Sequence, residues 1–130
     1  MGVRNVAAII LLIFLSAFLS AQEAGSDNPR ERARAARAMA EQGSSAIPAL
    51  REMLRDPEYE VRLEAVKAIV QIGTQHSLDA LIDATRDADP EIQIRATDGL
   101  VDFYLPGYVK TGLTATLRKV GKSIKAKFTD

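Results

Sequence analysis

Few residues in this chain have the types and spacing that catalysis requires. The single histidine, His76, precedes Asp79 by three residues, a spacing that would suit a general base with an orienting carboxylate. An ordinary surface histidine in a turn is the simpler interpretation, because helices are expected on both sides of it. The sequence has no G-x-S-x-G, no phosphate-cradling glycine loop and no H-E-x-x-H motif. We therefore predict that the protein is not an enzyme.

Metal and cofactor binding are disfavoured by the residue inventory. The chain contains no cysteine, which excludes disulfides, thiolate nucleophiles and cysteine-based metal cages. Asp79 and Asp83 lie one helical turn apart, but two carboxylates supply far fewer than the roughly 6 to 8 oxygen ligands that calcium prefers. We expect no catalytic residue, no metal ion and no cofactor.

The segment 56–87 predicts two antiparallel helices joined by a tight turn. Asp56 is expected to cap the first helix, with Pro57 in its first turn, where a missing N–H costs nothing. Gly73 supplies the left-handed conformation that ends this helix, and a leucine-rich second helix follows. The polar side of the first helix is predicted to carry Glu60, Glu64, Lys67 and Gln71.

The same unit recurs upstream and downstream. DPEYEVR, residues 56–62, reappears as DPEIQIR, residues 89–95, at a shift of 33. Upstream, residues 32–43 match residues 62–73 at a shift of 30. Each hairpin can bury its apolar side only against a neighbour, so repeats of this length predict a solenoid.

This pattern resembles the HEAT repeat family, in the bacterial form described as PBS-lyase-like. The family has aspartate and proline before its first helix, an arginine near the helix start, glycine at the turn and a second helix ending in aspartate. These places are filled by Asp56, Pro57, Val61, Arg62, Gly73, Leu78, Leu81 and Asp87. The resemblance spans residues 28–105 and implies an all-α fold, a short α-solenoid of about two and a half to three helical hairpins. The iron-dependent and bilin-lyase activities of some relatives rest on no residue that can be matched here.

The resemblance also implies roles for charged residues. In the family the repeated aspartate and arginine hydrogen-bond between neighbouring repeats, a stacking role that would fall to Asp56, Arg62, Asp87, Asp89 and Arg95. The second helices would line the inner side of the stack, a surface that binds extended peptides or other proteins. The candidate partner-binding residues on it are Arg51, Glu52, Arg55, Asp79, Asp83 and Arg86.

The first 21 residues have the plan of a secretory signal peptide. Arg4 is their only charge, and an uncharged run of 14 residues from Val6 to Leu19 precedes small residues and the polar sequence QEAGSDN. That run is shorter than the roughly 20 residues that span a bilayer. We expect cleavage after Ala21 and an extracytoplasmic protein, periplasmic or secreted. The alternative is an uncleaved segment that anchors the protein in the membrane.

The remaining chain divides into a short linker and the repeats. The expected parts are a signal peptide at 1–21, a linker at 22–28 and a HEAT-like domain at 29–130, with repeats at about 29–55, 57–87 and 90–128. The first repeat opens with an alanine-rich helix surrounded by Arg30, Arg32, Arg34 and Arg37. A solvated outer helix at the end of a solenoid explains these arginines, and nucleic acid is disfavoured as a partner of a secreted chain.

The third repeat departs from the pattern. Gly99 lies inside its first helix at a cost of about 1 kcal/mol relative to alanine, and Pro106 and Gly107 stand where the turn glycine is expected. A further amphipathic helix is indicated by Leu113, Leu117, Val120, Ile124 and Phe128. We expect this helix to replace the second helix of the repeat and to pack on Leu100, Val101 and Tyr104.

Charge is segregated along the chain although the formal net charge is zero. Residues 41–102 carry six basic and thirteen acidic side chains, whereas residues 103–130 carry six basic and one acidic. A basic amphipathic helix of this kind can lie on an anionic membrane or bind phosphate groups. The residues that would contact such a surface are Arg118, Lys119, Lys122, Lys125 and Lys127.

Together these features predict a non-catalytic, extracytoplasmic scaffold for protein–protein interaction. Its partner would be a protein or peptide bound to the second helices. The alternative function is binding to a membrane surface or envelope polymer through the basic C-terminal helix. Because the third repeat is irregular, further HEAT repeats or a second copy of the chain are additional candidate partners.

Overall fold

The computed structural model describes residues 3–107, and every regular element in that range is helical. In chain order the elements are α1 (Val3–Ala24), α2 (Pro29–Met39), the 3₁₀ helix η1 (Ala40–Ala46), α3 (Ile47–Met53), α4 (Tyr59–Ile72), the 3₁₀ turn η2 (Gln75–Ser77), α5 (Leu78–Ala84) and α6 (Pro90–Tyr104). The expected all-α fold is confirmed. The amphipathic helix expected after residue 112, with its basic residues, lies outside the described residues.

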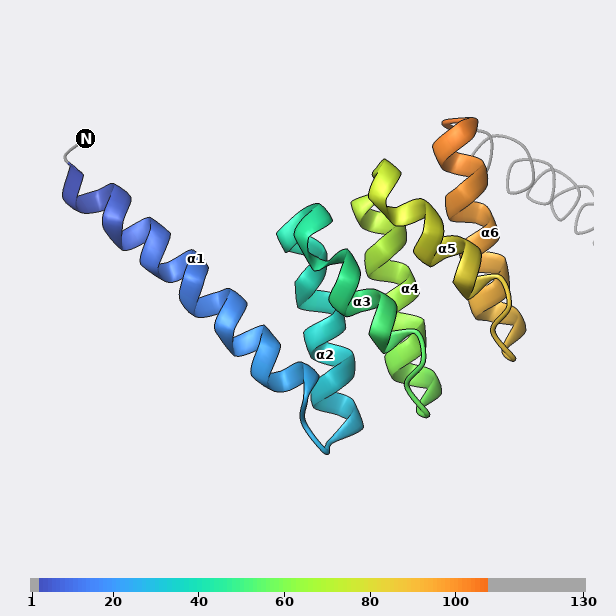
Figure 1. Cartoon of the computed structure of the whole chain (residues 1–130), viewed down its shortest axis with the longest axis horizontal. Coiled ribbons are helices and arrows are strands. Elements are labelled where there is room, and N and C mark those ends of the chain that lie inside the picture. Colours follow the sequence, from blue (N-terminus) through green and yellow to red (C-terminus); the bar gives the residue numbers. More distant parts are fainter. Residues whose placement is uncertain (1–2, 108–130) are drawn as a thin grey trace, which may run out of the picture.

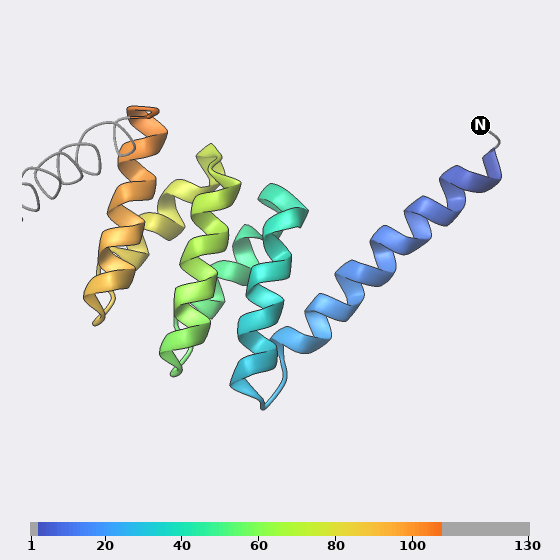
Figure 2. The ribbon, with the colours of Figure 1, turned by 180° about the vertical axis from the view of Figure 1, so that it is seen from behind.

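The helices from α2 onward form two layers. Figure 1 shows α2, α4 and α6 side by side in chain order, with α3 and α5 in a second layer across them. Figure 2, from behind, shows the first layer from its other side. Helices α2 and α3 form one hairpin, α4 and α5 form the next, and α6 stacks on α4 and α5. This layering in chain order is the α-solenoid that the repeats predict.

A continuous core runs between the two layers. The large side chains with the least exposure come from successive helices: Leu50 from α3, Ile69 from α4, Leu81 from α5 and Ile92 from α6. Helix α2 contributes mainly alanines and Met39 to this core. Each helix therefore relies on its neighbours for burial of its apolar side.

The turns use the residues that the sequence indicates, with one correction. Gly73 ends α4 in the left-handed conformation, at φ 56° and ψ 32°. Asn28 caps α2 and Asp89 caps α6 through hydrogen bonds from the amides two residues on. Asp56, however, is not the cap of α4: the N-cap position is Glu58, and Pro57 lies outside the helix. Asp56 instead accepts the Glu58 N–H at 2.9 Å, which forms a turn just before the helix.

Gly99 on α6 is buried where α6 approaches the preceding hairpin. A Cβ atom at this position would lie 2.7 Å from Cγ2 of Val70 and 3.2 Å from Cδ1 of Leu81. The sequence predicts only the helix-propensity cost of this glycine. The structure shows that its missing side chain also permits the close packing of α6.

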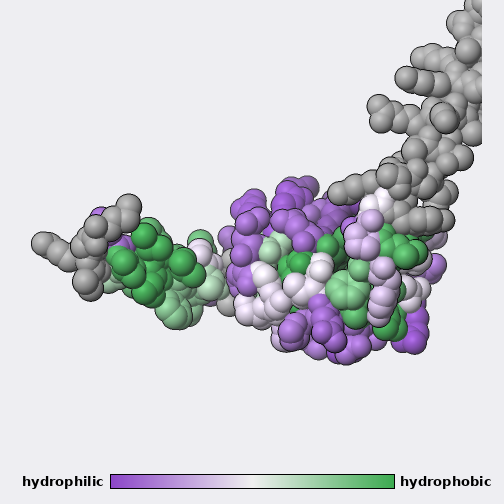
Figure 3. Space-filling model, turned by 90° about the horizontal axis from the view of Figure 1, so that it is seen from above, coloured by the Kyte–Doolittle hydropathy of each residue, from purple (hydrophilic) through white to green (hydrophobic). Residues whose placement is uncertain are grey.

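Helix α1 projects from one end of the solenoid. Figure 3 shows its apolar side chains gathered away from the repeats, while the face of the solenoid in view mixes hydrophilic and hydrophobic side chains. Within the described residues, the segment Asn5–Ala24 is 20 residues long with a mean hydropathy of 2.1, enough to cross a membrane by length and composition, as signal sequences also are. The helix extends beyond the expected boundary at residue 21, and Ala24 packs against the core. Residues 22–24 are therefore helical rather than part of a linker.

Candidate interaction surface and its supporting ladder

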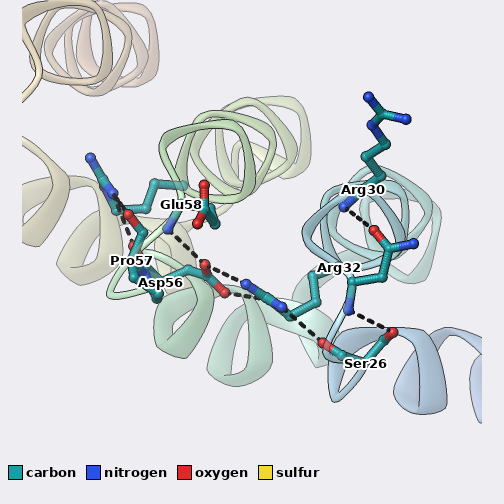
Figure 4. A network of polar contacts seen from close by, with 8 residues as sticks. Ser26, Arg30, Arg32, Asp56, Pro57 and Glu58 are labelled. Atoms are coloured by element: carbon teal, nitrogen blue, oxygen red, sulfur yellow. Dashed lines mark hydrogen bonds and ion pairs between the residues drawn. The ribbon is translucent and has the colours of Figure 1, made fainter.

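A partly buried ion pair joins the first repeat to the loop that leads into the second. Arg32 on α2 donates to the Asp56 carboxylate from Nε at 2.7 Å and from Nη2 at 3.0 Å. Its third nitrogen, Nη1, donates to the carbonyl oxygen of Ser26 at 2.9 Å (Figure 4). The two side chains are only 15% and 11% exposed. Arg32 thereby ties both ends of the first hairpin together.

The second repeat builds the same arrangement around Arg62. Its Nε donates to Asp87 Oδ2 at 2.9 Å, and its Nη1 donates to the carbonyl oxygens of Asp56 at 2.9 Å and Pro57 at 3.1 Å. In the third repeat Gln93 takes this place, and its amide donates to the Asp87 carbonyl oxygen at 2.6 Å. We call Arg32, Arg62 and Gln93, with their partners, the ladder. The stacking role expected for Asp56, Arg62 and Asp87 agrees with these contacts.

The ladder corrects the repeat alignment. Arg32, Arg62 and Gln93 each reach the carbonyl six residues earlier, so the second and third repeats are related by a shift of 31 and not 33. Within the described residues, Asp89 and Arg95 make other contacts than the stacking contacts expected of them. Asp89 caps α6, and Arg95 pairs within its own helix with Glu91 at 2.6 Å. In the repeated sequence DPE, Asp56 forms the turn before α4, whereas Asp89 is the N-cap of α6. The two copies of this sequence therefore do not occupy equivalent positions in their repeats.

The charge of Asp56 is stabilised by its partners. Burial alone would raise the pKa of this carboxyl. The hydrogen bonds from Arg32 and from the Glu58 N–H, with the positive charges of Arg32 and Arg62, outweigh burial, and the pKa of Asp56 lies below its usual value. The ladder therefore has an ionised carboxylate at its first step throughout the neutral pH range.

A second buried carboxylate, Glu64, was not anticipated from the sequence. The helical spacing assigns Glu64 to the wet side of α4, but the residue is only 6% exposed. Its carboxylate accepts Nε of Arg37 at 3.0 Å and Nζ of Lys67 at 2.9 Å. The hydrogen bond from Arg37 is the main reason that the pKa of Glu64 is lowered. The only sequence signal for this contact is the opposite charge of Arg37 and Glu64 in consecutive repeats.

The second helices, α3 and α5, are joined by an ion pair at the centre of the expected partner-binding set. Arg51 on α3 donates to Asp83 on α5 from Nε at 2.7 Å and from Nη2 at 2.6 Å. Both side chains are partly exposed, at 41% and 35%. This pair fixes the spacing of the two helices, and both charges are largely satisfied within the protein.

A shallow depression of about 290 Å³ surrounds that ion pair. It is lined by Arg51, Leu54, Arg55, Asp83, Ala84, Arg86 and Asp87. Four of the six candidate binding residues are thus brought together, while Glu52 pairs with Arg55 at 2.9 Å on the exposed surface and Asp79 lies outside the depression. Apolar side chains at the base and charges of both signs at the edge suit a short stretch of peptide.

The described residues offer little for catalysis or metal binding. His76 is exposed in η2, and no hydrogen bond joins it to Asp79 in the part of the chain that the structure describes. Within residues 3–107 no three histidine or carboxylate side chains converge as a set that could hold a metal ion.

Stacked helical hairpins with a repeated arginine–carboxylate ladder define an α-solenoid. A family model described as HEAT repeats matches residues 16–101, which is most of the chain. The protein therefore belongs to the HEAT repeat family, whose members generally act as scaffolds for protein–protein interaction. Among curated proteins, no significant match to the chain was found. A protein partner and a non-catalytic role agree with this family.

Proposed function

We propose that the protein is a non-catalytic, extracytoplasmic HEAT-repeat scaffold of the bacterial PBS-lyase-like form. It binds a protein or peptide on the surface made by α3 and α5. The observation that carries the proposal is the depression around the Arg51–Asp83 ion pair, because its lining combines apolar residues with the exposed cationic groups of Arg55 and Arg86.

Two arginines at the edge of the depression have charge available for a partner. The side chain of Arg55 is 65% exposed and that of Arg86 is 74% exposed. The closest carboxylate oxygen to Arg86 belongs to Asp83 at 3.9 Å, and Asp83 already accepts Arg51. A carboxylate of the partner would therefore gain more from Arg55 and Arg86 than from Arg51. Leu54 and Ala84 between them would contact an apolar side chain.

The extracytoplasmic location is supported by the N-terminal segment. It is apolar over Asn5–Ala24, lies near the N-terminus and has no buried side chains in its apolar window. We propose that it directs export and is removed after Ala21. Mass spectrometry of the protein isolated from its host should give a mature chain that begins at Gln22. A chain that retains Val3 to Ala21 and extracts only with detergent would support the anchored alternative.

Site-specific photo-crosslinking tests the binding surface. A photoreactive amino acid at Arg55 is expected to form adducts with a discrete partner in living cells of the host. The same substitution at Arg34, an exposed arginine of α2 without a side-chain hydrogen bond or ion pair among the described residues, is the matched control. Equal adducts from both positions, or none from Arg55, would contradict the proposal. An added Arg86→Glu substitution should reduce the Arg55 adducts several-fold.

A second function, binding to a membrane surface or envelope polymer, is favoured by the charge of the C-terminal segment. Residues 103–130 carry six basic side chains and one acidic side chain. Sedimentation with vesicles of anionic lipid tests this proposal. Substitution of Arg118, Lys119, Lys122, Lys125 and Lys127 by glutamine should abolish sedimentation if these residues make the contact. Neutral vesicles are the control.

A further inference from the structure

The side of α6 that faces away from α4 carries an exposed apolar stripe. Ile94 is 59% exposed and Leu105 is 56% exposed, and the partly exposed Val101 lies between them. Ile94 and Val101 are spaced by seven, so they lie on one side of α6, and Leu105 is the residue that directly follows the end of the helix. The buried residues of α6, among them Ile92 and Ala96, lie on the opposite side.

The repeat register shows that this stripe occupies a core position. At the shift of 31 set by the ladder, Ile94 stands where α4 has Leu63, which is only 7% exposed. One repeat earlier the same place is filled by Ala33, which is 6% exposed. In Figures 1 and 2, α4 has α6 beside it, whereas no described helix lies beyond α6. Ile94 therefore occupies a position that is buried in the preceding repeats, but no described residue covers it.

We infer that residues 113–128 of the same chain cover this side of α6, as a capping helix that closes the first layer of the solenoid. The segment follows α6 directly, and its connection from Leu105 to Gly112 is long enough for the chain to reverse. Sixteen helical residues would extend about 24 Å, close to the length of the 15-residue α6 at about 1.5 Å per residue. The sequence-based expectation placed this helix in the second layer, packed on Leu100, Val101 and Tyr104, and the inferred place shares only Val101 with that set.

Charge complementarity favours this occupant. Asp98 and Asp102 lie along one edge of the apolar stripe on α6 at the helical spacing of four. Neither forms an ion pair among the described residues, and Asp102 accepts the Gly107 N–H at 3.0 Å. The C-terminal segment presents the complementary pattern, in which the apolar stripe of an expected helix is flanked by Lys125 on one side and Lys127 on the other. Its remaining basic side chains would face water, which supplies the polar outer side that the last element of a solenoid needs for solubility.

Thiol labelling of the full chain tests the inference, because the sequence contains no cysteine. The Ile94→Cys variant should react with a soluble thiol reagent at least tenfold more slowly than the Ala49→Cys variant. Ala49 is an exposed residue of α3 in the other layer and serves as the control. Equal reaction rates at the two positions would overturn the inference.

Substitutions in the C-terminal segment identify what covers Ile94. In the Ile94→Cys background, Leu117→Asp with Ile124→Asp should restore fast labelling, as should Lys125→Glu with Lys127→Glu. Ala115→Asp with Ala126→Asp introduces the same two charges on the opposite side of the expected helix and should leave labelling slow. Slow labelling that survives both disruptive pairs would overturn the inference. Protection that depends on protein concentration would indicate a second copy, and protection only with anionic vesicles would indicate lipid; either result also overturns it.

Discussion

The two junctions between first-layer helices are built differently on their outer side. Between α2 and α4, Arg37 meets the buried Glu64 at 3.0 Å. Between α4 and α6, the corresponding positions are Lys67 and Arg95, two cations, and each pairs with a glutamate of its own helix. A hollow of about 220 Å³ lies there, lined by Lys67, Val70, Arg95 and Asp98. Only the ladder is common to both junctions.

This difference separates the ladder, which recurs at both junctions, from the outer ion pairs, which do not. The ladder uses a side chain that reaches a backbone carbonyl six residues earlier, so any repeat with a long donor at that position can form it. The outer contacts need complementary charges on two separate helices and are not repeated. We therefore expect the α4–α6 junction to depend more heavily on the ladder and on close packing at Gly99 than the α2–α4 junction does.

The largest expected effect comes from removing Arg62. Arg62→Ala leaves the carboxylate of Asp87 buried without its cation and two carbonyls without a donor, which should lower the free energy of unfolding by about 3 kcal/mol. Urea unfolding of the full chain measures this loss. Arg34→Ala, at an exposed arginine, is the control and should change stability by less than about 0.5 kcal/mol. A melting temperature of the Arg62→Ala variant equal to that of the wild type would show that the ladder does not contribute to stability.

Gly99 tests the close packing at the same junction. Gly99→Ala gains about 1 kcal/mol of helix propensity but places Cβ at 2.7 Å from Val70 Cγ2, a strain of about 1 to 3 kcal/mol. We expect a net loss of about 1 kcal/mol in urea unfolding. In a Val70→Ala background the same substitution should become neutral or stabilising. Additive effects in this double-mutant cycle would show that the two side chains do not meet.

Acid should weaken the α2–α4 junction first. The pKa values of Asp56 and Glu64 are lower in the folded protein than in the unfolded chain. Their contribution to stability is therefore full above the unfolded values, near about 4, and is lost as pH falls through the lower folded values. Hydrogen exchange between about pH 5 and 2 should show α2 opening before α6. Glu64→Gln should flatten this dependence, and a pH profile identical to wild type would contradict it.

The smallest effect is expected at Tyr59, whose hydroxyl donates to Glu91 on α6 at 2.7 Å. That hydrogen bond raises the pKa of Tyr59 to about 12. Because the folded pKa exceeds the unfolded value of about 10, the stabilising contribution is present below pH ~10 and is lost as pH rises toward 12. The difference between ultraviolet titrations of wild type and Tyr59→Phe isolates this group. A difference titration centred near about pH 10 would exclude the contact.

The sequence was sufficient for the parts of the fold that follow from local chemistry. Gly73 identifies a left-handed helix end, and the apolar spacing between it and the next repeat identifies the hairpins. Family likeness assigned Arg62 and Asp87 to the stacking of repeats, and the structure brings them together. These features depend on residues that are close in the sequence or on a sequence pattern that recurs in successive repeats.

Features that depend on two distant elements were not predictable in the same way. Periodicity placed Glu64 in water because it cannot show that Arg37 lies on the neighbouring helix. The repeated letters DPE led to a wrong register, because the aspartate of this motif lies three residues before the start of α4 but one residue before the start of α6. Arg51 and Asp83 were both assigned to a binding surface, but their pairing across α3 and α5 became visible only in three dimensions.

The loop before α2 has one further consequence for maturation. Ser26 supplies there the backbone oxygen that Asp56 supplies one repeat later, and its hydroxyl accepts the Asn28 N–H at 3.1 Å. A peptidase that cut the chain after Ala21 would leave Ser26, Asn28 and Arg32 in place. The folded repeats would therefore keep the Arg32–Ser26 contact whether or not residues 1–21 were removed, as we propose.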